Sequence, residues 1–519
     1  MPLVLALDSV PGLRGILCLH ENVATGAADG YGRMAGKPAM CLLHLGPGLA
    51  NGLTNLHNAR RAFTPMLNVI GQHATWHLPA DPLLATDITA IARTVSDYVK
   101  ENQSAATVAT DLAAAIEAAM REGGSVATLI VPHDSQTGAA DSPSPMPMPR
   151  AQPQKTYSLD RVTRCAAALK TGNSALLLGG EALSEAGMML AGRIAGSKGA
   201  DLLCDTFFAR MERGVGLPPV ARLPYFADEA VKLTRRYKHV IVAGTRRPVA
   251  FFGYEGLPSY LIDDQQTVML AGPREDAVSA LAALASDLGA PEWSAPTTGS
   301  PPALPTGILN AQSISEVIAH MQPENCIVMD EALTVGEPYF EASKDAPRFT
   351  HLRLTGGAIG QGPGAATGAA IACPNRGVIN YQSDGCGAYT VQALWTQARE
   401  NLSVVTIIGS NRSYNILNVE LARARVTKLG PTARSMTSLD DPHLDWVKIA
   451  EGFGVSSVAV ETPAALAREL EIALAQKGPR LIEAIMAQTR RSSRSADRMV
   501  SRGGGHQVSK STACKKVGK

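Results

Sequence analysis

Two polar turns in the C-terminal third of the chain carry oxygen donors that suit a hard cation. The apolar run 377–381 stops just before Asp384, and the apolar run 404–408 stops just before Asn411. Asp384 offers a carboxylate, Asn411 offers an amide oxygen, and Ser413 can add a backbone carbonyl. Mg²⁺ prefers such ligands and is usually completed by phosphate and water. The alternative is that both turns merely cap the ends of strands.

A second group of residues with chemical potential lies near the N-terminus. Glu21 precedes a predicted helix over 23–34, and His44 closes a predicted strand over 39–44. A histidine at such a place can carry protons near neutral pH. The simpler alternatives are that Glu21 only complements the helix dipole and that His44 is a hydrogen-bonded structural residue.

The glycine-rich segment 355–368 could also bind a ligand. It contains Gly360-x-Gly362-x-x-Ala365, which mimics a dinucleotide-binding fingerprint. Pro363 lies inside that pattern, and no convincing strand–helix–strand context surrounds it. We therefore reject a dinucleotide site here and expect the segment to serve another role.

These side chains need a framework that brings them together. Each apolar run has the length of a buried strand, and between the runs Leu394, Trp395 and Ala398 recur at helical spacing. A strand–helix–strand unit with parallel strands places both carboxyl ends at one edge of a sheet. Ligands of open α/β sheets bind at that edge.

The whole chain alternates short apolar runs with Ala- and Gly-rich helical stretches, which predicts an α/β fold of doubly wound parallel sheets. Because 519 residues are too many for a single core, we expect three domains separated by Pro-rich linkers. The predicted strands are 15–19, 39–44, 66–70, 128–131, 174–178, 239–243, 326–329, 377–381, 404–408 and 480–485. The predicted divisions are a first domain over 1–135, a linker over 136–156, a middle domain over 157–295, a third domain over 306–487 and a disordered basic tail over 488–519.

Composition argues against several classes of protein. A formal charge of +2 gives no general electrostatic case for a nucleic-acid or membrane partner. The eight cysteines form no CxxC pair, which argues against a zinc site and a disulfide framework and favours a reducing, cytoplasmic setting. No apolar run is as long as a membrane span. The basic tail could bind nucleic acid, although a solvated extension is the simpler expectation.

Taken together, the motifs resemble those of thiamine diphosphate (ThDP)-dependent 2-oxo-acid enzymes, in the branch of acetolactate synthase and benzoylformate decarboxylase. The family signature is Gly-Asp-Gly followed by a distant Asn. Here Asp384 and Asn411 are 27 residues apart, and Ser383 stands in place of the first glycine. The run HENVATGAADGYGRMAGKPAMCLLHLGPGLANGLTNLHNA, which begins at His20, is similar to the family's pyrimidine-binding domain. The layout resembles the family's pyrimidine-binding, middle and diphosphate-binding domains.

The resemblance implies ThDP and Mg²⁺ as cofactors, a small 2-oxo acid as substrate, and a homodimer or homotetramer with sites shared between subunits. It implies that Glu21 activates the cofactor's aminopyrimidine from a dry pocket in which burial raises its pKa. It implies His44 as an acid–base group toward the substrate. The implied metal ligands are Asp384, Asn411 and Ser413. The further implied cofactor contacts are Asn51, Thr334, Gly357, Ile359, Gly385, Cys386 and Tyr414.

Within the family, these residues leave decarboxylation and carboligation open. Ile359 would wedge the two cofactor rings into a bent shape, and Gly357 would offer its carbonyl to the 4′-amino group. His44 and the short loop around Ile359 favour simple decarboxylation, whereas the turn 46–51 suits either reaction. The pair Gly179-Gly180 in the middle domain lacks a dinucleotide pattern, so we expect no functional flavin. A second possibility is a catalytically inactive ThDP-fold subunit partner.

The resemblance also raises an expectation about the N-terminus. Family members carry a further segment before the position of Val4, with a strand, a helix and a turn that lines the substrate site. Without it, we expect the first sheet to have an exposed edge and apolar surface. We also expect the chain of 519 residues to bind ThDP poorly.

Overall fold

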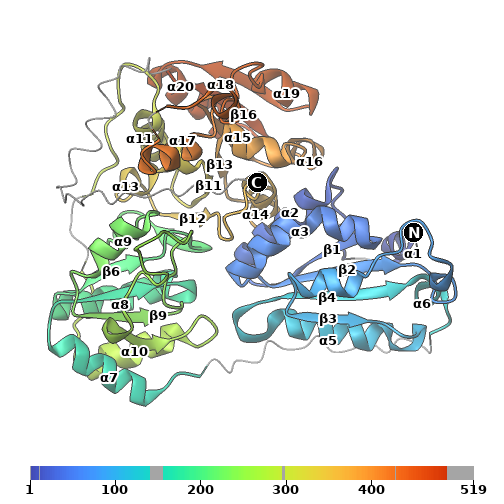
Figure 1. The fold of residues 1–519 in the computed structure, drawn as a ribbon, viewed down its shortest axis with the longest axis horizontal. Coiled ribbons are helices and arrows are strands. Elements are labelled where there is room, and N and C mark those ends of the chain that lie inside the picture. The colour runs from blue at the N-terminus through green and yellow to red at the C-terminus, as the bar shows by residue number, and fades with distance from the viewer. Residues whose placement is uncertain (1, 11, 141–155, 295–298, 427, 488–519) are drawn as a thin grey trace, which may run out of the picture. The chain divides into compact units, whose positions relative to one another are not determined.

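Alternating strands and helices build three separate sheets, which confirms the predicted α/β fold with parallel sheets (Figure 1). The structure, a computed structural model, describes residues 2–10, 12–140, 156–294, 299–426 and 428–487. All three sheets lie within the unit Met1–Met486. The predicted disordered tail and most of the predicted first linker lie outside the described residues. Among the residues that the structure does describe, no helix has the length and apolarity needed to cross a membrane.

The first sheet has four parallel strands in the order β1-β2-β4-β3. Its strands are β1 (Ala39–His44), β2 (Met66–Gln72), β3 (Tyr98–Glu101) and β4 (Val126–Pro132). Its helices are α1 (Pro2–Ala6), α2 (Glu21–Ala35), α3 (Leu45–Ala62), α4 (Ile88–Arg93), α5 (Val108–Met120) and α6 (His133–Thr137). Because β1 lies at the edge, its residues Met40 and Leu42 are 48% and 42% exposed. An exposed apolar edge is what the sequence led us to expect.

The predicted strand over 15–19 is wrong, because these residues form no ladder with β1. They lie instead against α16 (Ala393–Arg399). The Leu17 carbonyl accepts a hydrogen bond from Thr396 (3.1 Å), and Arg14 pairs with Glu400 (2.6 Å). A run with strand propensity becomes a strand only where a neighbouring strand supplies the ladder.

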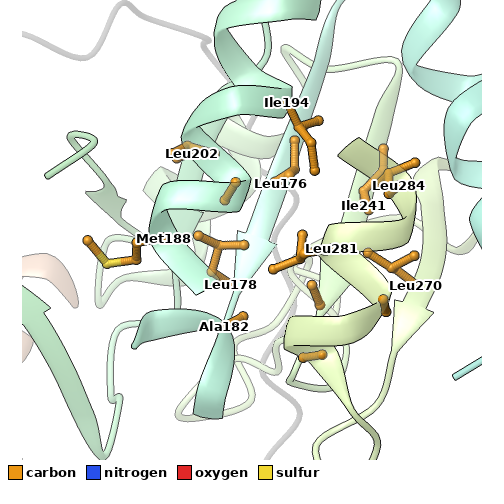
Figure 2. Packing of buried hydrophobic residues seen from close by; sticks show 14 of the residues in the cluster. Leu176, Leu178, Ala182, Met188, Ile194, Leu202, Ile241, Leu270, Leu281 and Leu284 are labelled. Carbon is orange, nitrogen blue, oxygen red and sulfur yellow. The ribbon is translucent and has the colours of Figure 1, made fainter. Parts of the chain in front are cut away.

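The second sheet, in the middle of the chain, is parallel with the order β10-β9-β5-β6-β8. Its strands are β5 (Ser174–Leu178), β6 (Asp201–Cys204), β8 (Ala221–Arg222), β9 (His239–Ala243) and β10 (Thr267–Ala271). Its helices are α7 (Leu159–Lys170), α8 (Glu185–Lys198), α9 (Ala227–Thr234) and α10 (Ala277–Asp287). Leu178 of β5, Ile241 of β9, Met188 of α8 and Leu281 of α10 belong to one buried cluster (Figure 2). This cluster packs the helices onto the sheet and so fixes the turns that follow β5 and β9.

The third sheet has seven strands in the order β15-β16-β14-β13-β11-β12-β7. Its strands are β7 (Arg210–Arg213), β11 (Cys326–Glu331), β12 (Phe349–Arg353), β13 (Val378–Ser383), β14 (Val404–Ser410), β15 (Ser456–Val460) and β16 (Arg480–Ile485). Its helices are α11 (Ala311–Met321), α12 (Leu333–Gly336), α13 (Tyr339–Ala342), α14 (Gly362–Ala372), α15 (Asp384–Gly387), α16, α17 (Asn415–Arg423), α18 (Pro431–Ser435), α19 (Trp446–Gly452) and α20 (Pro463–Leu474). The edge strand β7 comes from the middle of the chain and pairs antiparallel with β12. This sheet therefore crosses the predicted boundary between the middle and third domains.

Helices α2 and α14 lie side by side (Figure 1). Glycines on both helices let the two backbones approach closely. A Cβ added at Gly30 would lie 2.0 Å from the carbonyl oxygen of Ala365, and one added at Gly368 would lie 1.8 Å from that of Ala27. Only glycine permits so close an approach. The contact joins the helix layer of the first sheet to that of the third.

A buried ion pair reinforces the same junction. Arg33 and Asp29 pair at 2.7 Å on α2, with side chains only 2% and 0% exposed. Arg33 also donates to the backbone carbonyls of Arg353 (2.8 Å) and Ala209 (3.1 Å). Gln361 donates to the Asp29 carboxylate (2.5 Å). Distant parts of the chain therefore meet at Arg33.

Replacing Arg33 by alanine should lower the free energy of unfolding by about 3–5 kcal/mol, because the buried Asp29 carboxylate loses its partner. The matched control is R60A, which breaks an ion pair with Asp97 whose side chains are 47% and 27% exposed. That control should cost about 1 kcal/mol or less. Urea unfolding followed by circular dichroism compares the two variants, and equal losses would contradict the proposed difference.

Candidate cofactor site

The turns after β13 and β14 meet at the carboxyl edge of the third sheet. These two strands are paired neighbours, so Asp384 and Asn411 follow them side by side. The Asp384 carboxylate accepts backbone hydrogen bonds from Gly385 (2.8 Å) and Arg412 (2.5 Å). The structure thus brings together the two turns that the sequence singles out.

Asp384 is a buried carboxylate that backbone N–H groups contact. It is 2% exposed. Burial raises its pKa to about 6, although backbone N–H groups oppose that shift. Within the described ranges no Lys, Arg or His side chain forms an ion pair with it. Buried charges in proteins are normally paired or bound to a metal, so this carboxylate fits a divalent cation.

The second turn places further oxygen atoms beside Asp384. The side-chain oxygen of Asn411 accepts a hydrogen bond from the Ser413 backbone (2.9 Å), and an amide oxygen carries a second lone pair. Tyr414 packs over Gly385, because a Cβ added at that glycine would lie 2.5 Å from the tyrosine ring. The donor set of carboxylate, amide and carbonyl oxygens is one that suits Mg²⁺.

Two other predicted cofactor contacts flank these turns. Cys386 is buried in α15, and burial raises the pKa of its thiol well above the ordinary value, so the thiol stays protonated. Thr334 is half-buried in α12, directly after β11, which pairs in parallel with β13. Its hydroxyl therefore belongs to the same edge of the sheet as Asp384.

Glu21, His44 and Asn51 form a second cluster at the carboxyl end of β1. The Asn51 side chain donates to the Glu21 carboxylate (3.1 Å). A Cβ added at Gly48 would lie 3.5 Å from Glu21 Oε1 and 3.5 Å from His44 Cβ. In the single chain Glu21 is half-buried and His44 is exposed. The structure brings Glu21, His44 and Asn51 close together, and their roles in catalysis stay predictions.

A glycine turn, residues 355–361, leads into α14. Gly357 and Gly360 have left-handed φ angles of 77° and 94°, which other residues rarely adopt. Phe251, from the middle of the chain, covers Gly357, where an added Cβ would lie 2.5 Å from the ring. Ile359 is half-buried. The turn therefore presents this side chain from a backbone of narrowly defined shape.

Glu331 is not singled out by the sequence, yet it holds the glycine turn. Its carboxylate accepts backbone hydrogen bonds from Gly360 (2.8 Å), Gln361 (3.0 Å) and Gly362 (2.8 Å). Burial raises its pKa to about 7, although these hydrogen bonds oppose the shift. Two features of the sequence could have pointed to Glu331. It is an acidic residue at the end of an apolar strand, and the chain also contains a glycine-rich helix start whose N–H groups need acceptors.

A separate cleft of about 1580 Å³ opens at the carboxyl edge of the second sheet. Its lining includes Gly179, Gly244 and Phe251, and it reaches Gly356 of the glycine turn. Asp384 does not line it. The residues predicted to hold the metal therefore lie outside this cleft, and their assignment stays a prediction. The expected lack of a flavin stays a prediction.

Comparison with known proteins identifies related domains at both ends of the chain. The N-terminal TPP binding domain of thiamine pyrophosphate enzymes matches residues 1–91, and the C-terminal TPP binding domain of these enzymes matches residues 335–484. A Mycobacterium tuberculosis (strain H37Rv) protein, provisionally named acetolactate synthase large subunit IlvX, is 46% identical over 491 residues. The match covers 94% of this chain and 94% of that protein.

A more distant relative is named for decarboxylation. Benzoylformate decarboxylase from Pseudomonas aeruginosa is 25% identical over 511 residues, covering 92% of each chain. The solved structure of the thiamine diphosphate-dependent 4-hydroxybenzoylformate decarboxylase of Rhodococcus jostii RHA1 matches with a TM-score of 0.80 at 21% identity. It covers 93% of this chain and 94% of that one, and at this identity it supports the fold alone.

Replacing Gly362 by alanine should destabilise the start of α14. A Cβ there would lie 1.9 Å from the Gln382 side-chain nitrogen and 2.8 Å from the Glu331 carboxylate. Overpacking of this kind costs about 1–3 kcal/mol. The control is G377A, because no atom lies within 4 Å of a Cβ at that glycine. Thermal unfolding compares the two, and a G362A protein as stable as G377A would refute the packing described here.

Proposed function

Because the chain belongs to the thiamine pyrophosphate enzyme family, we propose that it uses ThDP and Mg²⁺ to decarboxylate a small 2-oxo acid. Membership places it among the ThDP-dependent decarboxylases and carboligases of 2-oxo acids. The metal, the main product and the roles of single residues are our proposal. When bound, ThDP supplies a nucleophilic carbon that adds to the 2-oxo group and lets CO₂ leave.

The observation that carries the metal part of the proposal is the buried, unpaired carboxylate of Asp384. We assign Mg²⁺ to Asp384, the Asn411 side-chain oxygen and the Ser413 carbonyl. A divalent cation there would neutralise the carboxylate and attract a diphosphate. Thr334 follows β11 at the same edge of the sheet, and Tyr414 packs over Gly385.

The other residues are assigned to proton transfer and to holding the cofactor rings. With ThDP bound, Glu21 would share a proton with the aminopyrimidine ring, and the Asn51 hydrogen bond (3.1 Å) would orient the Glu21 carboxylate. The Gly357 carbonyl would accept a hydrogen bond from the cofactor's amino group, and Ile359 would support the cofactor rings. His44 moves a proton at the substrate's carbonyl oxygen.

We propose that two chains complete each site, in a homodimer or homotetramer. Glu21 is only half-buried in the single chain, whereas proton sharing with a cofactor needs a dry pocket. The edge strand β1 beside it exposes Met40 and Leu42, and Trp76 in the same part of the chain is 77% exposed. A second subunit would cover apolar surface of this kind.

We also propose a cytoplasmic location, without a nucleic-acid or membrane partner. All cysteines within the described ranges are free thiols, and free thiols suit a reducing compartment. The formal charge of +2 offers no general attraction for polyanions.

The two relatives compared above are named for different reactions. The 46% identical protein is named for acetolactate synthase, and a 25% identical one is a benzoylformate decarboxylase. We propose aldehyde release as the main reaction, because His44 stands at the end of β1 where it can deliver a proton to the substrate-derived fragment. The alternative is a catalytically inactive subunit partner that retains the ThDP fold.

Glu21→Gln should lower kcat for CO₂ release by about 10²–10⁴-fold, because it removes the shared proton, while ThDP binding stays measurable. Asp384→Ala should abolish Mg²⁺-dependent ThDP binding. E471Q, at an exposed position on α20, is the control and should match the unmodified chain. Isothermal titration with ThDP and Mg²⁺ measures binding. CO₂ release from pyruvate, benzoylformate and branched 2-oxo acids measures turnover.

The unmodified chain itself decides between the candidate functions in the same experiment. Binding of ThDP without turnover of any of these acids would support the inactive-subunit alternative. No binding at all would refute the proposed function.

His44→Ala should lower aldehyde formation by about 10²–10⁴-fold and raise the share of carboligation product among what is still formed. The matched control is H133A, because His133 is exposed at the start of α6. A coupled aldehyde assay run beside an acetoin assay measures both products. Unchanged aldehyde formation in H44A would remove His44 from the chemistry.

A further inference from the structure

Ile359 is flanked on both sides by backbone groups that side chains hold in place. The carbonyl just before it accepts a hydrogen bond from Asn58 (2.8 Å). The carbonyl of Gly360, just after it, accepts from Thr390 (2.8 Å) and from Asn55 (3.1 Å). An irregular buried turn needs such partners for its backbone. The position of Ile359 therefore depends on specific side chains outside the turn.

Glu331 holds the N–H side of the same turn. Its two oxygens accept the N–H groups of Gly360, Gln361 and Gly362 at 2.8–3.0 Å. N–H groups at the start of a helix have no partner within the helix, and Glu331 supplies one here. The helix dipole also favours a carboxylate at this end of α14. Glu331 is 1% exposed and Thr390 is fully buried. Bulk water therefore cannot replace the hydrogen bonds that these two side chains make to the turn.

We propose that Glu331 and Thr390 are positioning residues, which set the placement of Ile359 and of the Gly357 carbonyl against the cofactor rings. This inference rests on the proposed function. Both Glu331 oxygens are occupied by backbone N–H groups, so the residue acts through the turn. The metal and the diphosphate are assigned to a different set of residues around Asp384. Binding of the rings and binding of the diphosphate should therefore respond separately to changes at Glu331.

The principal test is Glu331→Gln, which keeps the shape of the side chain, removes its charge and turns one acceptor into a donor that faces an N–H group. We expect the Kd for ThDP with Mg²⁺ to rise about tenfold or more, because hydrogen bonds to a charged group are lost. The Kd for magnesium pyrophosphate, which has no rings, should change by less than about twofold. Isothermal titration of both ligands measures this split without any turnover.

Thr390→Val is a second variant, which removes only the hydroxyl that donates to Gly360 and leaves the buried charge in place. It should show the same selective loss of ThDP affinity, to a smaller degree. It keeps the proposal testable if E331Q fails to fold. The matched control is E337Q, because Glu337 is exposed and pairs with Arg222 at 2.6 Å away from the turn. Both affinities should be unchanged in that control.

Folded variants that bind ThDP as the unmodified chain does would overturn the assignment of these positioning residues. Equal weakening of ThDP and pyrophosphate would also overturn it, because that result indicates a general structural role. If the unmodified chain binds magnesium pyrophosphate but not ThDP, the proposed function fails and this inference fails with it. If the unmodified chain binds both ligands and only E331Q and T390V lose ThDP, the inference is supported.

Discussion

The close approach of α2 and α14 is the constraint on which the rest of the structure depends. Glycines on both helices let backbone meet backbone, with an added Cβ at Gly368 only 1.8 Å from a carbonyl of α2. That approach places α3, which packs on α2, where Asn55 and Asn58 can reach the glycine turn. The turn is thus built by the first and third sheets together. A larger residue at the helix contact would separate the partners that define the turn.

Four of the buried acids, Asp29, Asp330, Glu331 and Asp384, fall into two groups that differ in their hydrogen-bonding or ionic partners. Burial alone would raise the pKa of Asp330, but the Arg353 guanidinium at 2.5 Å, His351 and Arg222 together outweigh burial and lower the pKa to about 2. Asp29 is likewise paired with an arginine. Glu331 and Asp384 have backbone N–H groups as their partners, and burial raises both pKa values. Of Glu331 and Asp384, only Asp384 lies beside a second turn with oxygen acceptors among the described residues. A bound cation would therefore balance the buried charge of Asp384.

The sequence predicted much of this framework because fully buried strands are continuous apolar runs. The predicted and observed ends of β5 and β9 coincide for that reason, and those of β1 and β16 coincide as well. Strand β7 was missed because Arg210–Arg213 is short and polar and depends on a distant partner in β12. Residues 15–19 fail as a strand because their contacts lie on α16. Glu331 was missed because its hydrogen bonds reach 29 to 31 residues along the chain, a distance that local patterns do not encode.

The proposed roles of the Asp384 cluster and the Glu21 cluster differ because the two clusters lie in different parts of the fold. The oxygen donors around Asp384 belong to one sheet of one chain and are held by backbone hydrogen bonds within it, so they do not require a second subunit to take shape. Glu21 begins α2, whose face toward α14 is already filled, and its carboxylate is only half-buried. Proton sharing requires that the Glu21 carboxylate be shielded from solvent. Under the proposed assembly, metal binding is therefore a property of the single chain, whereas proton chemistry belongs to the associated state and depends on protein concentration.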